Sequence, residues 1–217
     1  DEEGKSGAVR MSEEGAMDGV DFVIAQHVDP TRPVGTMTIS AGPCSGGVDS
    51  WYGIIKGKGG HGAYPHTTVD PFYLLAHIIM ALNAITSRRL DPFAPAVVSI
   101  GSLNGGFTEN VIPDSIKITG TLRFTTPEVQ KQIHDEIKRA FEVARALGGE
   151  YELKLEIGAP PMINDERVSK VIEQVGQDLL GTENVQELHK SLGAEDFGSF
   201  MERAPGAMYM LGVQKKG

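Results

Sequence analysis

The chain has 217 residues, enough for one large domain or two modest ones, and its 29 acidic against 20 basic residues give a net charge of −9. No basic cluster is larger than Lys215-Lys216, which argues against a nucleic-acid partner, and no apolar run approaches the roughly 20 residues that span a membrane. Cys44 is the only cysteine, so an internal disulfide is excluded and a reducing, cytoplasmic compartment is expected.

The N-terminal stretch predicts the first elements of an α/β domain. A loop leads into a short helix that ends near Gly15, and the apolar run 20–25 is typical of a buried strand. That strand places His27 at its C-terminal end, which is where open α/β sheets hold their ligands. A second short strand is expected over 35–39, and the glycine-rich stretch 41–47 is typical of a linker.

The middle of the chain follows a regular βαββαβ pattern. Asp70 and Thr126 are each followed by a proline, which predicts a helix N-cap with proline at the first helical position. Strands are expected over 96–102, 115–124 and 151–157, and the last two alternate apolar and polar residues with a period of two. Two helices on one face of a four-stranded antiparallel sheet form a ferredoxin-like sandwich.

Beyond residue 160 the α/β character resumes. Asn164 is expected to cap a helix whose apolar stripe includes Val171 and Leu179, and a strand follows over 207–213. The sandwich is therefore inserted into another α/β domain. The expected domains are two pieces of that α/β domain, at 1–48 and 161–217, with the inserted domain at 49–160.

A glycine-rich loop over 57–66 carries His61 and His66. Its glycines allow positive φ angles and a close approach to another surface. An imidazole held on such a turn can present one hydrogen-bond donor to a developing negative charge. The alternative is a glycine-rich turn whose histidines are merely exposed, and we assign no role to His66.

Adjacent carboxylates at Glu2 and Glu3 can serve a metal site. Their side chains diverge in an extended loop, so one can bind a metal while the other faces a bound water as general base. His27 is a second candidate ligand. The alternatives are a solvated charge pair and a packed or capping histidine.

Several stretches agree in order and spacing with one known family. They are Asp-Glu-Glu-Gly at 1–4, residues 13–21, Gln-His-Val at 26–28, the loop 57–66, Asn-Val-Ile-Pro-Asp at 110–114, Gly-Thr-Leu-Arg-Phe at 120–124 and Gly-Ala-Glu-Asp-Phe at 193–197. Over essentially its whole length the chain resembles the M20 metallopeptidase/amidohydrolase family, in the branch with N-acyl-amino-acid amidohydrolases, hippurate hydrolases, auxin-conjugate hydrolases and carboxypeptidases.

This resemblance implies part of a zinc-peptidase-like α/β catalytic domain with an inserted ferredoxin-like dimerisation and lid domain. It implies hydrolysis of the amide bond of N-acyl amino acids or short peptides by a metal-activated water. Glu2 would be the general base, Glu3 and His27 would be ligands of two divalent cations, and His61 would stabilise the oxyanion from across a homodimer interface. Zn²⁺ or Mn²⁺ is expected, with Co²⁺ or Ni²⁺ as alternatives.

Two further residues match substrate-binding positions of the family. Asn110 would hold the carbonyl of the substrate and Arg123 its carboxylate. Arg123 also suits this role by itself, because it lies on the polar face of its strand and a guanidinium pairs bidentately with a carboxylate. A turn residue and a surface arginine are the corresponding alternatives.

The chain is expected to be a fragment that lacks both ends of such a protein. The family's first metal ligands lie upstream of position 1, and a final histidine lies beyond a strand like 207–213. Cys44 falls in the expected linker and receives no ligand role. A dipeptidase of the same family and a catalytically inactive binding or dimerisation protein are the other hypotheses.

Overall fold

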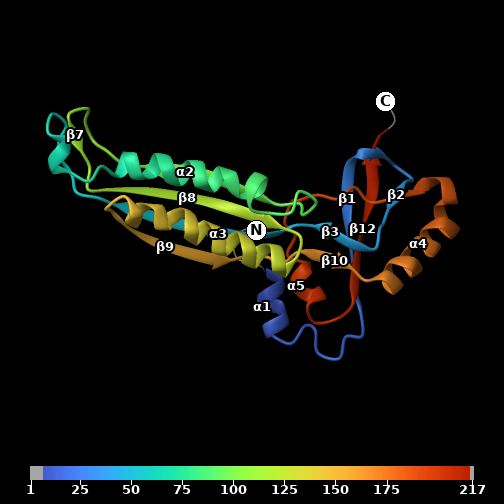
Figure 1. Ribbon diagram of the computed structural model, residues 1–217. Coiled ribbons are helices and arrows are strands. Elements are labelled where there is room, and N and C mark those ends of the chain that lie inside the picture. Colours follow the sequence, from blue (N-terminus) through green and yellow to red (C-terminus); the bar gives the residue numbers. More distant parts are fainter. Residues whose placement is uncertain (1–6, 216–217) are drawn as a thin grey trace. The chain divides into compact units, whose positions relative to one another are not determined.

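The computed structural model describes residues 7–215, and the chain divides into two compact units. One unit combines Asp1–Gly47 with Gly158–Gly217, and the other is Val48–Ile157. Figure 1 shows the first unit in the blue and the orange-to-red colours of the two ends of the chain, and the inserted unit in the colours between.

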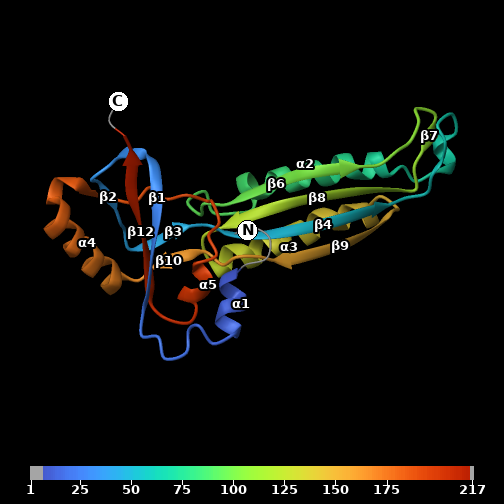
Figure 2. The same cartoon turned by 180° about the vertical axis from the view of Figure 1, so that it is seen from behind.

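The inserted unit is an α/β sandwich with two helices on one face of a four-stranded sheet. Its elements are β4 (Gly47–Lys56), α2 (Pro71–Arg88), β6 (Val97–Asn104), β8 (Ser115–Phe124), α3 (Pro127–Ala146) and β9 (Glu150–Ile157). The strand order is β6-β8-β4-β9, and the outer pairs β6–β8 and β4–β9 are antiparallel. The helices lie side by side in Figure 1 and behind the sheet in Figure 2. The predicted ferredoxin-like sandwich is confirmed.

Both predicted helix starts are confirmed. Asp70 caps α2 through a 2.8 Å hydrogen bond that its Oδ1 accepts from the Phe72 amide. Thr126 caps α3 through a 3.4 Å hydrogen bond from the Val129 amide. A proline follows each cap at the position where the amide has no partner within the helix, so it costs no hydrogen bond.

The core of the inserted unit lies between the two helices and the sheet. The alternation predicted for β8 is confirmed, since its buried side chains are Ile116, Ile118, Leu122 and Phe124. Trp51 of β4 packs edge-on against Phe141 of α3, with ring centroids 6.1 Å apart. Gly120 is required here, because a Cβ would lie 2.0 Å from the Ser99 carbonyl oxygen. The alternation predicted for β9 fails at Ile157, the last residue of the strand, which is 79% exposed.

The other unit contains a four-stranded sheet and a two-stranded ribbon. The sheet order is β1 (Val23–Pro33), β12 (Gly206–Gln214), β2 (Met37–Thr38) and β11 (Val185–Gln186). The ribbon pairs β3 (Gly42–Ser45) with β10 (Met162–Asn164). The helices are α1 (Gly7–Glu13), α4 (Glu166–Leu180), the short η2 (Thr182–Asn184) and α5 (Gly198–Met201). None of the helices in the described part of the chain is both long and apolar enough to cross a bilayer.

The first predicted strand is too short. The apolar run predicts a strand that ends before His27, whereas β1 runs for 11 residues to Pro33 and His27 lies inside it. The reason is tertiary: β1 pairs in parallel with β12 from Val23 to Asp29, so its backbone groups have partners even where the side chains are polar. The strand expected over 35–39 is in turn shorter, as β2.

The stretch 41–47 is not a linker. Residues 42–45 form β3, and Cys44 is buried there with its Sγ donating a 3.3 Å hydrogen bond to the Met162 carbonyl. Burial raises the pKa of the Cys44 thiol to about 11. Cys44 packs in a small core together with Phe197 and Met208.

The cap of α4 is also corrected. Asp165 is the N-cap, and its Oδ1 accepts hydrogen bonds from the amides of Arg167 and Val168. Asn164 is the last residue of β10, and its buried amide group bonds the Ser40 carbonyl and both backbone groups of Met208. Asn164 therefore joins segments far apart in sequence, which its position before a helix did not reveal.

Candidate functional site

His61 lies at the end of a small ribbon in the inserted unit. The ribbon pairs β5 (Gly60–His61) with β7 (Val111–Ile112), and the short helix η1 (Pro65–Thr67) follows β5. Nδ1 of His61 accepts a 3.0 Å hydrogen bond from the Ala63 amide. Since an accepting ring nitrogen carries no proton, the proton of the neutral imidazole is on Nε2. The exposed ring therefore offers a donor at Nε2.

Asn110 is the neighbour of the histidine loop. Its carbonyl accepts a 2.8 Å hydrogen bond from the Gly62 amide, directly after His61. The Nδ2 group of its exposed side chain can donate, as in any asparagine. The structure thus brings the backbones of the two sequence-predicted residues His61 and Asn110 close together.

The glycines of the loop are explained by its close contact with residues 110–114. A Cβ on Gly59 would lie 2.6 Å from the Ile112 carbonyl oxygen, and one on Gly62 would lie 3.2 Å from the Asn110 carbonyl oxygen. The side chain of Asp114 also contacts the loop, where its Oδ1 accepts a 2.9 Å hydrogen bond from the Gly59 amide. The sequence analysis assigned no role to Asp114. The feature that could have revealed it is its position as the acidic last residue of the Asn-Val-Ile-Pro-Asp motif.

Arg123 is not near His61 within one chain. It lies on β8 opposite Val97 of β6 and is half-buried. The loop contacts the chain just before Ser115, where β8 begins, and Arg123 lies eight positions further along that strand. At about 3.3 Å per residue this is a distance of about 26 Å. Figure 1 shows β7 at one end of the inserted unit and β8 along its length.

His27 lies on β1 of the other unit, opposite Met210 of β12. Its Nδ1 is 2.8 Å from the Val28 carbonyl oxygen. Because a carbonyl only accepts, Nδ1 carries the proton and Nε2 keeps its lone pair. An imidazole whose second nitrogen donates to a backbone carbonyl is the usual state of a metal-ligating histidine. The tautomer of His27 therefore fits the predicted ligand role.

A hollow of about 670 Å³ adjoins His27. His189, Leu188 and Met210 also line it. Arg32 contributes a guanidinium that lies 3.3 Å from Oδ2 of Asp29 and donates to the side chain of Gln186. Hydrogen bonds from Thr31 are the main cause that lowers the pKa of Asp29. No motif had singled out His189 or Arg32.

Glu2 and Glu3 lie outside the described residues, so the structure does not place them. Within residues 7–215 no three His, Cys, Asp or Glu side chains are grouped closely enough to hold a metal ion. Of the motif Gly-Ala-Glu-Asp-Phe, Asp196 accepts a 3.1 Å hydrogen bond from the Ala8 amide of α1. The motif thus anchors the helix that follows the paired glutamates.

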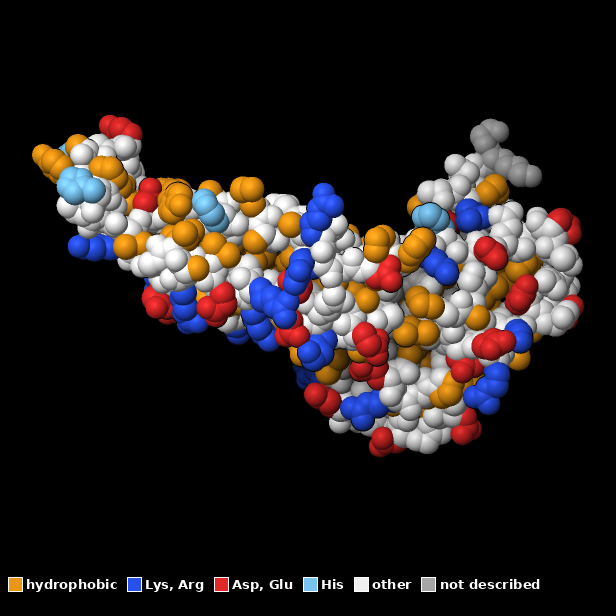
Figure 3. Space-filling view, in the orientation of Figure 1, with side chains coloured by type: hydrophobic (Ala, Val, Ile, Leu, Met, Phe, Trp, Pro, Cys, Tyr) orange, Lys and Arg blue, Asp and Glu red, His pale blue; other side chains and the backbone are white. Residues whose placement is uncertain are grey.

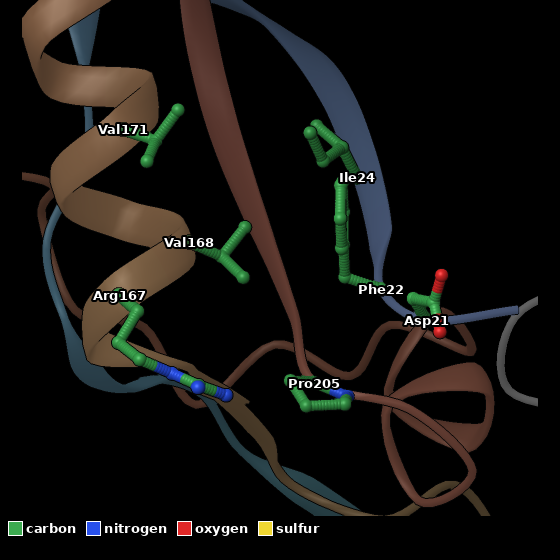
Figure 4. Close-up of a pocket in the computed structure, with 7 residues that line it drawn as sticks. All are labelled: Asp21, Phe22, Ile24, Arg167, Val168, Val171 and Pro205. Atoms are coloured by element: carbon green, nitrogen blue, oxygen red, sulfur yellow. The ribbon is translucent and has the colours of Figure 1, made fainter.

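A second hollow, of about 380 Å³, is mainly apolar. In Figure 4 the side chains Val168 and Val171 of α4 face Ile24 and Phe22 across it. The apolar stripe predicted for α4 is therefore only partly covered: Ile172 is buried, whereas Val171 and Leu179 are 63% and 77% exposed. The hollow has no histidine and is not a candidate catalytic site.

Comparison with known proteins agrees with this arrangement. Residues 45–147 match the peptidase dimerisation domain of the M20 type. The chain is 35% identical to thermostable carboxypeptidase 1 of Saccharolobus solfataricus, over 99% of this chain and 55% of the relative. It is also 35% identical to the N-acetyl-L-cysteine deacetylase of Bacillus subtilis, over 98% of this chain and 51% of the relative.

A solved structure shows the same fold. The YXEP protein of Bacillus subtilis, described as a dinuclear metal-binding peptidase from the M20 family, superposes with a TM-score of 0.80 at 28% identity, over 95% of this chain and 52% of that one. The chain spans about half the length of the curated relatives that it matches.

Proposed function

Since this chain is related to the M20 hydrolases over nearly its whole length and contains their dimerisation domain, we propose that the full protein hydrolyses the amide bond of N-acyl amino acids with divalent metal ions. The observation that supports the proposal is the backbone contact between the two segments that carry His61 and Asn110. His61 pairs with Val111 in the β5–β7 ribbon, and the Asn110 carbonyl accepts a hydrogen bond from the Gly62 amide, so both exposed residues belong to the same end of the inserted unit.

His61 stabilises the negative charge that develops on the carbonyl oxygen of the scissile amide. The Ala63 amide holds the ring with its proton on Nε2, so the donor is in place before the reaction. Asn110 donates to the same carbonyl group. Such a preorganised donor is typically worth about 2.7–4 kcal/mol of transition-state stabilisation.

Arg123 binds the carboxylate of the substrate, but in another copy of the chain. About 26 Å of strand separates it from the loop of its own chain, which exceeds the length of an acylated amino acid. Each site therefore takes His61 and Asn110 from one copy and Arg123 from the other. This makes a homodimer part of the proposed function.

The two copies pair through α2 and β6. β6 is an edge strand of its sheet, and α2 exposes the large side chains Phe72, Tyr73 and Met80. Figure 3 shows hydrophobic side chains along this helix. An exposed apolar helix face beside an open strand edge is a surface that commonly pairs with a second copy.

The proposed metal site combines His27 with Glu2 and Glu3, which lie outside the described residues. His27, with its Nε2 lone pair, and Glu3 hold cations, and Glu2 accepts the proton of the attacking water. Two divalent cations, Zn²⁺ or Mn²⁺, supply Lewis-acid activation of water and carbonyl when bound. The relative described as dinuclear supports two ions. The unpaired, buried Cys44 suits a reducing compartment, and we assign the protein to the cytoplasm on that basis.

The test is amino-acid release from a panel of N-acyl amino acids and dipeptides, with and without added Mn²⁺ or Zn²⁺. It uses a protein extended to the length of its relatives, with Glu2→Gln as the control. Metal-dependent release from acylated substrates that is lost in Glu2→Gln supports the proposal. Release only from dipeptides with a free amine indicates a dipeptidase, and no release by a folded, metal-loaded protein contradicts hydrolysis of this substrate class.

A further inference from the structure

Asp114 bonds the glycine-rich loop twice. Its carbonyl oxygen accepts a 2.8 Å hydrogen bond from the Gly57 amide. Its side-chain Oδ1 accepts a 2.9 Å hydrogen bond from the Gly59 amide. Asp114 itself stands between β7 and β8, so one residue ties the loop to the start of the long central strand.

The loop is held by hydrogen bonds rather than by packing: besides the two to Asp114, β5 pairs with β7 and Lys58 forms a bridge with Val69. Residues 61–67 are exposed, and the core of the inserted unit contains no residue of the stretch 57–67. The approach of the loop to the stretch before β8 requires glycine at position 59, since a Cβ there would lie 2.6 Å from the backbone Ile112 carbonyl oxygen. A loop with little buried apolar surface depends on such bonds for one defined conformation.

His61 lies between two loop residues whose amides are hydrogen-bonded to the stretch 110–114. Gly59 is held by Asp114 two residues before it, and Gly62 is held by the Asn110 carbonyl directly after it. The hydrogen bond that sets the His61 tautomer comes from the Ala63 amide on the same backbone. Loss of the Asp114 side chain removes the acceptor of the Gly59 amide and so weakens the hold on the backbone just before His61.

We propose that Asp114 is a positioning residue that fixes the conformation and the tautomer of His61. This inference rests on the proposed role of His61 as the oxyanion donor. Asp114 contacts backbone amides and not the substrate. Because an amide needs an acceptor and not a charge, an asparagine at 114 keeps the function, whereas an alanine loses it.

The direct test is the ¹⁵N NMR signature of the His61 ring in the 217-residue chain at alkaline pH, assigned with His61→Gln. The wild type is expected to show distinct protonated and unprotonated ring nitrogens. Asp114→Ala moves the two shifts toward their average, and Asp114→Asn restores them. The matched control is Asp91→Ala, which removes a 2.9 Å carboxylate-to-amide hydrogen bond at Phe93 in the same unit. An unchanged His61 signature in a folded Asp114→Ala protein would overturn the proposal.

Kinetics of the extended protein give a second readout. Asp114→Ala is expected to lower kcat about tenfold to a hundredfold while KM changes less than about twofold, because misplaced groups cost mainly the chemical step. Asp114→Asn is expected to recover most of the loss. Equal kcat in wild type and Asp114→Ala contradicts the positioning role. If the extended protein hydrolyses no substrate, the proposed function fails, and the ring signature still decides the role of Asp114.

Discussion

Nδ1 of His61 accepts a 3.0 Å hydrogen bond from the backbone amide of Ala63, two residues further along the chain. This local contact leaves the proton on Nε2 and makes the ring a donor toward solvent. His27 has the opposite tautomer, because its Nδ1 donates to the Val28 carbonyl. The two predicted site histidines therefore have different tautomers, which suit the proposed roles of a donor for His61 and a metal ligand for His27.

Replacing His61 tests the donor role. In the extended protein, His61→Ala is expected to lower kcat by about 10²–10³ with little change in KM, since the interaction acts mainly in the transition state. His66→Ala, in the same loop, is the control and should stay within about threefold of wild type. Steady-state kinetics on an N-acetyl amino acid measures both. A large rise in KM with unchanged kcat would assign His61 to ground-state binding instead.

Mixing two inactive variants tests the arrangement across two copies. His61→Ala and Arg123→Ala extended proteins are each expected to be nearly inactive. Random reassociation makes half of the dimers mixed, and each mixed dimer has one site with both residues, so about a quarter of wild-type activity should return. The measurement is activity after unfolding and refolding the mixture. Recovery absent from dimers shown to be mixed would place both residues in one copy.

Replacing His27 tests the metal site. His27→Ala in the extended protein is expected to bind less than the two ions per chain that the dinuclear relative suggests, because one nitrogen ligand is lost. His189→Ala, which changes the same hollow, should keep the wild-type metal content. Elemental analysis after dialysis gives the metal-to-protein ratio. A full complement of metal in the His27 variant would remove His27 from the ligand set.

Cys44 predicts how stability depends on pH. Burial raises the pKa of its thiol from 9.0 to about 11, so the folded state disfavours the thiolate. The protonated thiol therefore contributes its full stabilisation below pH 9. As the pH rises from 9 to about 11, this stabilisation is lost, and the unfolding free energy falls by about 2–3 kcal/mol. Urea unfolding at several pH values measures this loss. Cys44→Ala should lose less stability over the same range, and an equal loss would refute the assignment.

Local sequence patterns were enough to predict the helix starts and the buried face of β8 in the inserted unit. Asp70 and Thr126 cap their helices as predicted, and the period of two in β8 matches its buried face. These features depend on neighbours within a few residues in sequence. The alternation predicts a buried Ile157, but this residue is exposed at the end of β9, where no helix in the described part of the chain packs over its side chain.

The other unit was predicted less well, because its elements depend on partners far away in sequence. β1 extends past His27 since β12, more than 170 residues later, supplies its hydrogen bonds. Asn164 was predicted as a helix cap, but its side-chain amide group forms hydrogen bonds with the backbone of Ser40 and Met208 instead. Neither partner can be inferred from local residue pattern.

The candidate site residues were proposed from the sequence, as a glycine-rich loop with His61, the motif with Asn110 and a strand with Arg123, and their roles stay predictions. Only the tertiary structure decided their geometry. Pairing of β5 with β7 places Asn110 beside His61, whereas the length of β8 keeps Arg123 about 26 Å from the loop. The physical reason is that residue types determine which chemistry is possible, while hydrogen bonds between distant segments determine which groups can act on one substrate.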